Sequence, residues 1–306
     1  MIFYFSGTGN SFVIAQKLAE CLDEKLIEMA SFHSKKPSLS FNVNTDVVGF
    51  VFPVYAWGMP KTVEDFLNND FHSVILEIQD NDHSARHSEN LYLHKKSDSL
   101  ESLKSSVLTN NASAARNPYV FLILTCGDDT GKTHIFFMNK LKRKYGLHVD
   151  ACWSIQMPNT YVSIPGFDVD KKSVAERKIK NAALKIPSIS YQIKSHSTGI
   201  LDVKVGAIPN IKSYVLRPLF KTFLSSPRKF HSEYSVCSGC KLCIKSCPLK
   251  NISFETRTNG SEIPHWGDNC TMCLACYHKC PHHAIGWSIF TKKKRQYSIN
   301  NLEPKT

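Results

Sequence analysis

The chain begins MIFYFSGTGNSFVIAQKLAE (residues 1–20), where a run of apolar residues leads into a short loop with two glycines. Beyond the loop, apolar residues recur about every 3.6 residues, which predicts a helix. These residues are Phe12, Ala15, Leu18, Ala19 and Leu22. The order is therefore strand, glycine loop, helix. A loop in that place directs backbone N–H groups and the positive end of a helix at an anion, most often a phosphate.

Side chains of this loop add further donors for an anion. Ser6, Thr8 and Ser11 supply hydroxyl groups, and Asn10 is a residue type that caps helices. The loop lacks the lysine of a G-x4-G-K-S/T nucleotide loop, and it also lacks a G-x-G-x-x-G run. A plain glycine turn between a strand and a helix is the alternative interpretation.

Strand and helix patterns alternate through the rest of the N-terminal half. Apolar runs predict strands at residues 46–54, 120–125 and 147–157. Helical patterns occupy residues 60–69, 130–145 and 171–194, the last with Pro187 inside it. This alternation predicts an α/β fold with a doubly wound parallel sheet. Ligands of such sheets bind at the carboxyl ends of the strands, where we expect the loops at residues 6–11, 53–60 and 125–131.

The three loops resemble those of flavodoxins. SGTGNS (residues 6–11) is similar to the loop around the FMN phosphate, YAWG (residues 55–58) to the second loop, and TCGDDTG (residues 125–131) to the third. The resemblance covers residues 1–195 and implies a five-stranded, flavodoxin-like domain that binds FMN. It assigns these residues to the cofactor: Ser6, Gly7, Thr8, Gly9, Asn10, Ser11, Pro53, Val54, Tyr55, Ala56, Trp57, Gly58, Thr125, Cys126, Gly127 and Asp128.

The resemblance also implies roles for the second loop. Tyr55 or Trp57 would stack on the isoalloxazine ring, and Gly58 would offer a backbone that changes its hydrogen bond to N5 with the redox state. Ordinary core packing is the alternative for both aromatic residues. Residues 157–161 (MPNTY) either line the flavin site or form a plain strand-end turn.

Two positions depart from the flavodoxin pattern. Met59 stands where flavodoxins often have an acidic residue, so the anionic reduced flavin should form more easily. Gly131 stands about where the third loop usually has an aromatic residue. One face of the flavin is therefore expected to be open toward a partner or toward the rest of the chain.

The C-terminal part contains a cysteine repeat. Eight of the eleven cysteines fall into two sets at an offset of 33 residues: Cys237, Cys240, Cys243 and Cys247, then Cys270, Cys273, Cys276 and Cys280. Pro248, Ile252 and Phe254 recur at the same offset as Pro281, Ile285 and Trp287. A fixed offset over several residue types indicates a duplicated structural unit.

Both sets have the spacing C-x2-C-x2-C-x3-C-P, in which the fourth cysteine binds the other of two [4Fe–4S] clusters. We therefore predict cluster 1 on Cys237, Cys240, Cys243 and Cys280, and cluster 2 on Cys247, Cys270, Cys273 and Cys276. Zinc is the alternative, although zinc sites usually hold two C-x2-C pairs apart on a longer loop. The motif resembles that of two-cluster bacterial ferredoxins, which implies a small α+β domain at residues 230–290.

Charge is distributed unevenly along the chain. Residues 1–150 hold 15 Lys/Arg and 17 Asp/Glu, whereas residues 151–306 carry a net charge of +14. No nucleic-acid-binding motif accompanies this basic surplus, so nucleic acid is not predicted as a partner. Two oxidised clusters, each with a charge of about −2, offset part of this positive charge. An acidic redox protein is a partner that fits the positive charge that remains. The KKKR run at residues 292–295 is expected to lie in a solvated tail.

Composition also predicts where the protein works. No run of 18 apolar residues appears, and no basic region precedes the first apolar stretch, so neither a membrane span nor a secretory signal is expected. Clustered cysteines in a large intracellular protein indicate metal binding rather than disulfides. We therefore expect a reducing, cytoplasmic environment.

These patterns divide the chain into a flavodoxin-like domain (1–195), a linker with a helix at residues 215–224 (196–229), a ferredoxin-like domain (230–290) and a basic tail (291–306). A serine-rich surface insertion with a short helix is predicted at residues 71–117. A metal site on its histidines is a weaker interpretation; they are His72, His83, His87 and His94.

Together the parts resemble a flavodoxin–ferredoxin fusion. That resemblance implies a protein that passes electrons between FMN, two [4Fe–4S] clusters and an external redox partner, a soluble ferredoxin or reductase. The alternative is an FMN-dependent oxidoreductase acting on a small molecule such as a quinone, with the clusters as relay. Asp128 and Asp129 are the nearest acid–base candidates, and no catalytic residue is assigned. A third, non-redox interpretation treats the clusters as structural.

Overall fold

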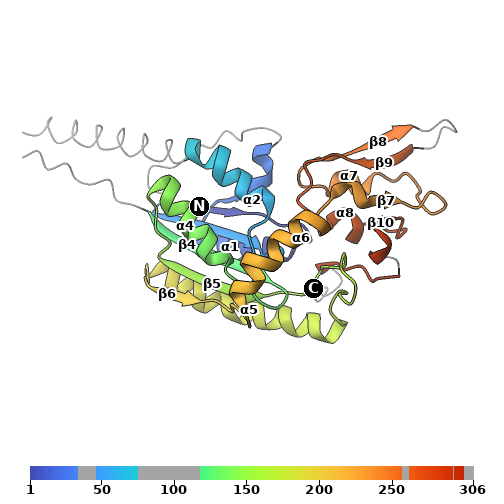
Figure 1. Ribbon diagram of the computed structural model, residues 1–306. Helices are drawn as coiled ribbons and strands as arrows, with labels where there is room; N and C mark the ends of the chain where they lie inside the picture. Colours follow the sequence, from blue (N-terminus) through green and yellow to red (C-terminus); the bar gives the residue numbers. More distant parts are fainter. Residues whose placement is uncertain (34–45, 75–117, 257–261, 292, 300–306) are drawn as a thin grey trace, which may run out of the picture.

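The computed structural model describes residues 1–33, 46–74, 118–256, 262–291 and 293–299. Within these residues, a six-stranded sheet forms the centre of the N-terminal part, in the order β2-β1-β3-β4-β5-β6 (Figure 1). All neighbouring strands in it are parallel. The strands are β1 (Ile2–Tyr4), β2 (Leu26–Glu28), β3 (Val47–Pro53), β4 (Tyr119–Cys126), β5 (Ala151–Gln156) and β6 (Ile200–Asp202).

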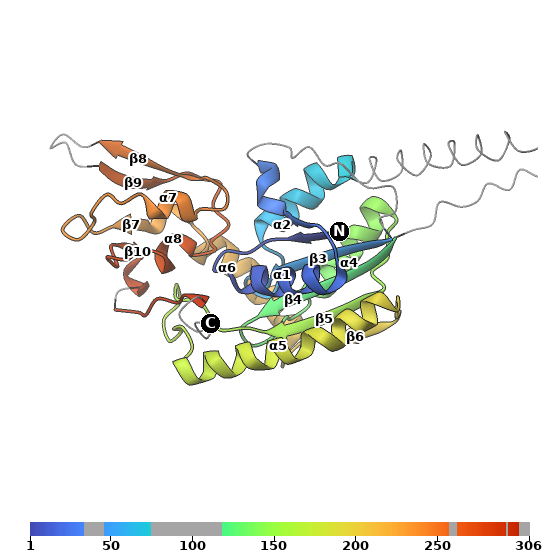
Figure 2. The same cartoon turned by 180° about the vertical axis from the view of Figure 1, so that it is seen from behind.

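Helices cover both faces of this sheet, which is why its central strands are apolar throughout. All eight residues of β4 are buried. Phe121 and Ile123 face a core shared with α1 (Asn10–Leu22) and α5 (Lys172–Lys194). Leu122 and Leu124 face the other core, shared with α2 (Lys61–Asp65), η2 (Phe66–Asp70) and α4 (Thr133–Tyr145). Figure 1 and Figure 2 show the two faces from opposite sides.

The predicted α/β fold is confirmed, with one strand more than the expected five in the described part of the chain. The extra strand, β6, pairs with the first half of β5, from Ala151 to Trp153. It falls within residues 196–229, which we expected to be a linker, so the sheet continues past residue 195. The helix expected at residues 215–224 is present as α6 (Arg217–Leu224), preceded by the π-helical η4 (Ile211–Leu216).

The C-terminal part has the expected small α+β architecture. In the described residues, β7 (Phe230–Ser232) pairs with β10 (Ile285–Trp287), and β8 (Ile252–Thr256) pairs with β9 (Glu262–Trp266), both antiparallel. The short helices α7 (Leu242–Ser246) and α8 (Ala275–His278) follow the cysteine-rich loops. α6 lies between this part and the sheet (Figure 1).

The backbone repeats with the same offset as the cysteines. Lys241 and Leu274, which directly precede α7 and α8, both have φ of 60°. Lys250 and His283 are likewise both left-handed, at φ of 50° and 52°. Left-handed backbone is costly for residues other than glycine, so its recurrence at matching positions supports a duplicated unit.

The expected solvated tail at residues 291–306 is wrong for its described part. Tyr297 and Ile299 are only 7% and 6% exposed. The Lys294 ammonium donates to the Val162 carbonyl at 2.7 Å, and the Arg295 guanidinium donates to Asp168 at 3.1 Å. The basic side chains thus bind acceptors on the loop after β5, while the apolar residues between them pack inward.

The insertion predicted at residues 71–117 begins too early. Phe71 and Val74 belong to the buried core beside α2 and α4, because residues 71–74 continue the preceding helix. The remainder of the insertion, including the residues of the predicted short helix and His83, His87 and His94, lies outside the described residues. None of the described helices has both the length and the apolar character needed to cross a membrane.

Candidate functional site

A cavity of about 300 Å³, the sheet-edge cavity, opens at the carboxyl ends of the strands. The strand order reverses between β1 and β3, and ligands of open α/β sheets bind at such a switch point. The volume is at the lower end of the range for ligand pockets, about 300–1,000 Å³. All three predicted loops line the cavity, through Ser6, Gly7, Thr8, Asn10, Ser11, Pro53, Val54, Tyr55, Ala56, Thr125, Cys126 and Gly127.

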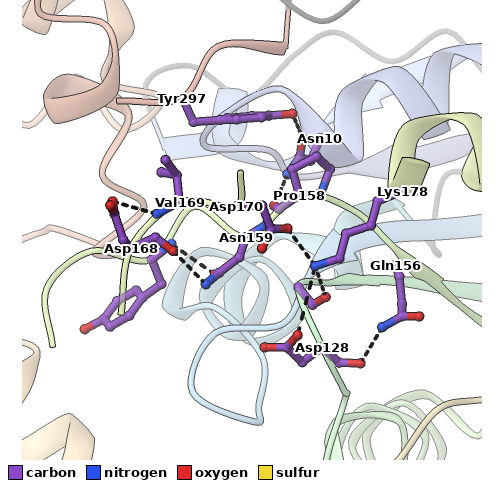
Figure 3. A network of polar contacts seen from close by, with 12 residues as sticks. Asn10, Asp128, Gln156, Pro158, Asn159, Asp168, Val169, Asp170, Lys178 and Tyr297 are labelled. Carbon is purple, nitrogen blue, oxygen red and sulfur yellow. Dashed lines mark hydrogen bonds and ion pairs between the residues drawn. The ribbon is translucent and has the colours of Figure 1, made fainter. Parts of the chain in front are cut away.

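The first loop leaves the start of α1 free to face a ligand. Gly9, not Asn10, stands at the N-cap, with left-handed φ of 98°, and no side chain caps the helix. The Asn10 amide instead donates to the Pro158 carbonyl at 2.9 Å, and its oxygen accepts from the Tyr297 hydroxyl at 2.6 Å (Figure 3). Gly9 N–H donates to the Ser6 hydroxyl at 3.1 Å, and the N–H groups of the first turn of α1, which no side chain caps, suit a phosphate.

The second loop is a closed turn that separates its two aromatic residues. Tyr55 N–H donates to the Gly58 carbonyl at 3.0 Å, and Gly58 N–H donates back at 3.1 Å. Tyr55 lines the cavity, whereas Trp57 and Gly58 do not. The Trp57 side chain is directed toward Gly131. A Cβ added to Gly131 would lie 2.8 Å from the Cβ of Trp57. Of the two candidates for ring stacking, the structure therefore places only Tyr55 at the cavity.

Arg217 explains why Gly58 is shielded. A Cβ on Gly58 would lie 1.9 Å from the Arg217 guanidinium. That guanidinium donates to the carbonyls of Tyr55 and Met59, each at 3.0 Å, and to Glu64 at 2.8 Å. Hydrogen bonds from Arg217 of α6 therefore fix the backbone near the expected contact with flavin N5.

The third loop is tied to the first and to α5. The Thr125 and Ser11 hydroxyls are hydrogen-bonded at 2.7 Å. Lys178 donates to the Gly127 carbonyl at 2.7 Å. Asp128, an expected FMN residue, is exposed and does not line the cavity, and neither does Gly9. Burial, with Asp129 and Asp128 nearby, raises the pKa of the Cys126 thiol to about 12, so this group is neutral.

The opening expected at Gly131 is filled. An added Cβ there would lie 2.6 Å from the Ser213 hydroxyl, in addition to meeting Trp57. Ser213 belongs to η4, and its hydroxyl donates to the Trp57 carbonyl at 3.1 Å. The third loop lacks the usual aromatic residue at Gly131. Trp57 of the second loop and Ser213 of η4 fill that space instead.

Two further walls of the cavity lie outside the three loops. Residues 157–161, for which a plain turn was the alternative interpretation, line the cavity. Tyr161 packs against Phe220 of α6, with ring centroids 5.5 Å apart. The bridging helix contributes Arg217, Phe220 and Lys221. A helix was expected here, but only the tertiary packing shows which loop it covers.

The last wall comes from the ferredoxin-like part. Residues 270–274, here called the cluster-2 loop, line the same cavity as the three flavodoxin-like loops. A Cβ added to Gly7 would lie 2.4 Å from Cys273 Cβ. Burial raises the pKa of Tyr55 well above its usual value, and Cys273 and Cys270 add to this rise. Tyr55 therefore stays a neutral phenol between the two parts.

The cysteines of each predicted set lie near one another. Cys237, Cys240, Cys243 and Cys280 line one small cavity together. In the other set, burial and then neighbouring thiols raise the pKa of Cys273 to about 12, and the thiols involved are Cys270 and Cys247. All eleven cysteines are free of disulfides. Crowded, buried thiols resist ionisation, so a cationic iron centre is what would hold them as thiolates.

Backbone N–H groups also donate hydrogen bonds to cysteine sulfur atoms of the repeat. Asn251 N–H donates to Cys247 Sγ and Ala284 N–H to Cys280 Sγ, both at 3.3 Å and again 33 residues apart. Such donors stabilise electron-rich sulfur and tune cluster potentials. Among the described residues no three His, Cys, Asp or Glu side chains converge closely enough for a single metal ion. A four-iron cube places its thiolates on separate corners, so its ligand shell is wider.

Comparison with known proteins agrees with this division. Residues 1–78 match a family model described as a flavodoxin domain, and residues 236–297 match a 4Fe-4S dicluster domain. No curated protein matches the chain. Among solved structures, "The Structure of Trp Repressor Binding Protein from Bacillus subtilis" is similar, with 15% identity over 51% of this chain and 84% of that chain and a TM-score of 0.30.

A flavodoxin domain implies FMN, and a dicluster domain implies two [4Fe–4S] clusters, so the chain has a flavin and iron–sulfur electron-transfer role. Its two domains, in this order on one chain, are those of a flavodoxin–ferredoxin fusion.

Proposed function

We propose that the protein carries electrons between FMN in the sheet-edge cavity and an external redox protein, through cluster 2 and then cluster 1. The observation that carries the proposal is the shared wall of the cavity. The cluster-2 loop, which holds two expected ligands of cluster 2, lines it together with the three flavodoxin loops. FMN takes one or two electrons and each cluster takes one, so contact between the sites allows stepwise transfer.

Cluster 1 suits the role of the outlet to a partner. Of the eight expected ligands, all of them described, Cys240 of cluster 1 is the exposed one, while Cys243 and Cys280 of the same cluster are buried. Leu242 is 39% exposed beside Cys240, and Lys241 and Lys245 are exposed on either side. Lys241 is paired with Glu262 at 2.7 Å, and an exposed leucine flanked by two lysines suits an acidic redox protein, such as a ferredoxin or reductase.

The test begins with protein purified and reconstituted without oxygen. About eight iron atoms and about one FMN per chain are expected, since two four-iron clusters and one flavin require them. Flavin is then reduced by a light pulse, and bleaching of the clusters is followed in time. Cys240→Ser, in cluster 1, should leave transfer from flavin to cluster 2 intact while slowing reduction of the partner protein.

The matched variant is Cys273→Ser, in cluster 2. It should slow both the internal step and the reduction of the partner, while cluster 1 keeps its spectroscopic signal. Reduction of the partner at the wild-type rate after loss of cluster 2 would show that the flavin delivers electrons directly, and the proposed order would be abandoned.

The enzyme alternative is distinguished by the same preparation. Lys61 and Lys221 line the cavity and are 48% and 54% exposed in their side chains, so a small anionic substrate could reach it. Against catalysis, no Asp, Glu or His is among the described lining residues. Asp129 is bound to Lys212 at 2.6 Å, away from the cavity. Rapid turnover of a quinone without any protein partner would favour the enzyme.

A further inference from the structure

Trp266, the last residue of β9, carries a buried N–H group for which no oxygen or nitrogen atom is the acceptor. The residue is only 8% exposed, and its indole Nε1 has no such partner among the described residues. A buried donor without an acceptor is strongly unfavourable, and native proteins almost always supply one. A sulfur atom of the adjoining cysteine repeat is the acceptor that remains for this group.

Cys276, an expected ligand of cluster 2, supplies that sulfur atom. Burial and then Cys273 raise the pKa of the Cys276 thiol well above its usual value, and hydrogen bonding from the Trp266 side chain opposes this rise. A neutral thiol is a weak acceptor, whereas a thiolate on iron is charged and attracts an N–H group strongly. The contact between indole and sulfur is therefore tighter with iron bound than with the free thiol.

The surroundings of Trp266 fix its indole beside the cluster-2 ligands. Asn251 is bonded twice to Gly267, the next residue after Trp266: its amide donates to the Gly267 carbonyl at 2.7 Å, and its own carbonyl accepts from Gly267 N–H at 3.0 Å. The backbone N–H of the same Asn251 donates to Cys247 Sγ, another expected ligand of cluster 2, at 3.3 Å. The indole ring stacks on Phe230, with ring centroids 5.3 Å apart and an angle of 14° between the rings.

The other half of the repeat has a serine at the matching place. Ile252 pairs with Trp266, and Ile285, 33 residues further along the chain, pairs with Ser232. A serine hydroxyl lies two bonds from Cα, so it extends much less far from its strand than an indole N–H group does. The two halves supply matching backbone donors to sulfur, but they differ at this side-chain donor.

We propose that the Trp266 indole N–H donates a hydrogen bond to Cys276 Sγ and thereby raises the reduction potential of cluster 2 alone. A hydrogen bond to a sulfur ligand stabilises the electron-rich, reduced form of a cluster more than its oxidised form. Trp266 acts through the cysteine, so it is a positioning residue rather than a catalytic one. The inference rests on the proposed function in one respect, namely that cluster 2 takes up and releases one electron.

The experiment uses the full chain with both clusters and compares Trp266→Phe with Trp287→Phe. Phenylalanine keeps an aromatic ring against Phe230 and removes the N–H group. Trp287 is the matched control, because its buried indole donates to the Ser226 carbonyl at 3.0 Å rather than to a sulfur atom. The two one-electron potentials are measured by anaerobic redox titration, and the shifted proton magnetic resonance signals of the ligand cysteines assign each potential to its cluster.

We expect the ratio of reduced to oxidised cluster 2 at a fixed potential to fall about three- to tenfold in Trp266→Phe, as loss of one net hydrogen bond implies. At about 59 mV per tenfold change for one electron, the potential of cluster 2 falls by about 30–60 mV. Cluster 1 should keep its potential, and Trp287→Phe should change neither cluster. An unchanged cluster 2 potential in Trp266→Phe with full iron content would overturn the inference, and so would an equal shift of both clusters.

A second measurement covers loss of cluster 2 in the phenylalanine variant. The wild-type chain and Trp287→Phe are labelled with nitrogen-15 at the indole nitrogen of tryptophan, and pulsed electron paramagnetic resonance is recorded on reduced cluster 2. A nitrogen-15 coupling present in both proteins supports the contact, and absence of the coupling overturns it. A wild-type chain whose cluster 2 cannot be reduced at all is a different result, which would overturn the proposed function as well.

Discussion

Gly7 is a residue at which the two domains approach each other closely. An added Cβ would lie 2.4 Å from Cys273 Cβ and 2.9 Å from the Tyr55 hydroxyl. Gly7→Ala should therefore push the cluster-2 loop away from the first flavodoxin loop, because close-packed atoms cannot absorb such an overlap. We expect FMN affinity to fall by about tenfold or more, as loss of about 1.4 kcal/mol implies, and flavin-to-cluster transfer to slow.

The same variant separates contact from assembly. Cluster 1 should keep its signal, because the added methyl group meets Cys273 of the cluster-2 loop and none of the expected cluster 1 ligands. Equilibrium binding of FMN and light-induced cluster reduction are the two measurements. If both are unchanged in Gly7→Ala, the domains are not held at this contact in solution.

His134 is a buried base whose charge state should make stability depend on pH. It is 5% exposed in α4, its Nδ1 has no partner among the described residues, and burial followed by Lys132 lowers its pKa. The unfolded chain, with a histidine pKa of about 6.5, therefore binds more protons than the folded chain below that pH. Its contribution to stability is full above about pH 6.5 and is lost as the pH falls through the folded pKa.

The check is anaerobic thermal unfolding between pH 8 and pH 5.5. His134→Leu should lose less of its Tm over that interval than the wild type, and the two should differ least at pH 8. His278, whose pKa is lowered to about 4 by burial, adds a decline of the same sign to both proteins. Parallel Tm curves for the two proteins would show that His134 titrates normally.

At the scale of elements, α5 carries a proline in its interior. Pro187 is exposed and lies in the second half of this 23-residue helix. It cannot donate a backbone hydrogen bond, and its ring crowds the preceding turn. Pro187→Ala should stabilise the flavodoxin domain by about 1–3 kcal/mol, less the small advantage that proline gains by restricting the unfolded chain.

The effect of Pro187→Ala is measured as a rise in Tm. Lys180→Ala, at an exposed position of the same helix, serves as a control for helix propensity alone and should change the Tm little, since Lys and Ala are both good helix formers. A Tm at or below the wild-type value in Pro187→Ala would mean that the native helix is shaped around the proline.

Elements with long-range repetition or continuous apolar runs could be predicted from the sequence. The 33-residue offset in the cysteines reappears in the backbone of Lys241 and Leu274, and the run in β4 is buried throughout. β6 could not be predicted, because it is three residues long and mostly exposed, so only its pairing with β5 defines it.

Within the site, the loops could be predicted but the orientation of their side chains could not. Tyr55 and Trp57 are both aromatic residues of one loop, and the left-handed φ of 45° and 53° at Ala56 and Trp57 decides which of them lines the cavity. The cluster-2 loop was assigned to iron from its spacing alone. Its second role as a cavity wall depends on docking between domains, which no local pattern encodes.

At the scale of the whole molecule, the C-terminal segment joins the two domains near both cofactor sites. The Tyr297 hydroxyl donates to Asn10 in the first loop at 2.6 Å, and its backbone N–H donates to His278 Nδ1 in α8 at 3.1 Å. His278 Nε2 is 2.7 Å from the Thr160 carbonyl. These contacts hold the domains in one arrangement, so transfer from flavin to cluster 2 should not wait for a domain motion.

The uneven charge of the whole chain affects a different step, the encounter with an external redox partner. The C-terminal 156 residues carry a net charge of +14, whereas residues 1–150 carry −2. Attraction between a basic carrier and an acidic partner is screened by salt, with a Debye length of about 10 Å at 0.1 M. Electron transfer between FMN and cluster 2 across the cavity wall, as proposed, would involve no such encounter. The internal and external steps should therefore respond differently to ionic strength.

We expect the internal rate after a light pulse to be first-order, independent of protein concentration and nearly constant from 0.02 to 0.5 M salt. The rate of reducing an acidic ferredoxin should fall by about tenfold or more over the same range, as steered association does. Both rates are followed in one sample by the separate absorbance changes of flavin and acceptor. A basic acceptor protein is the control and should show the opposite trend. An internal rate that rises with protein concentration would show that flavin and cluster exchange electrons between molecules rather than across the cavity wall.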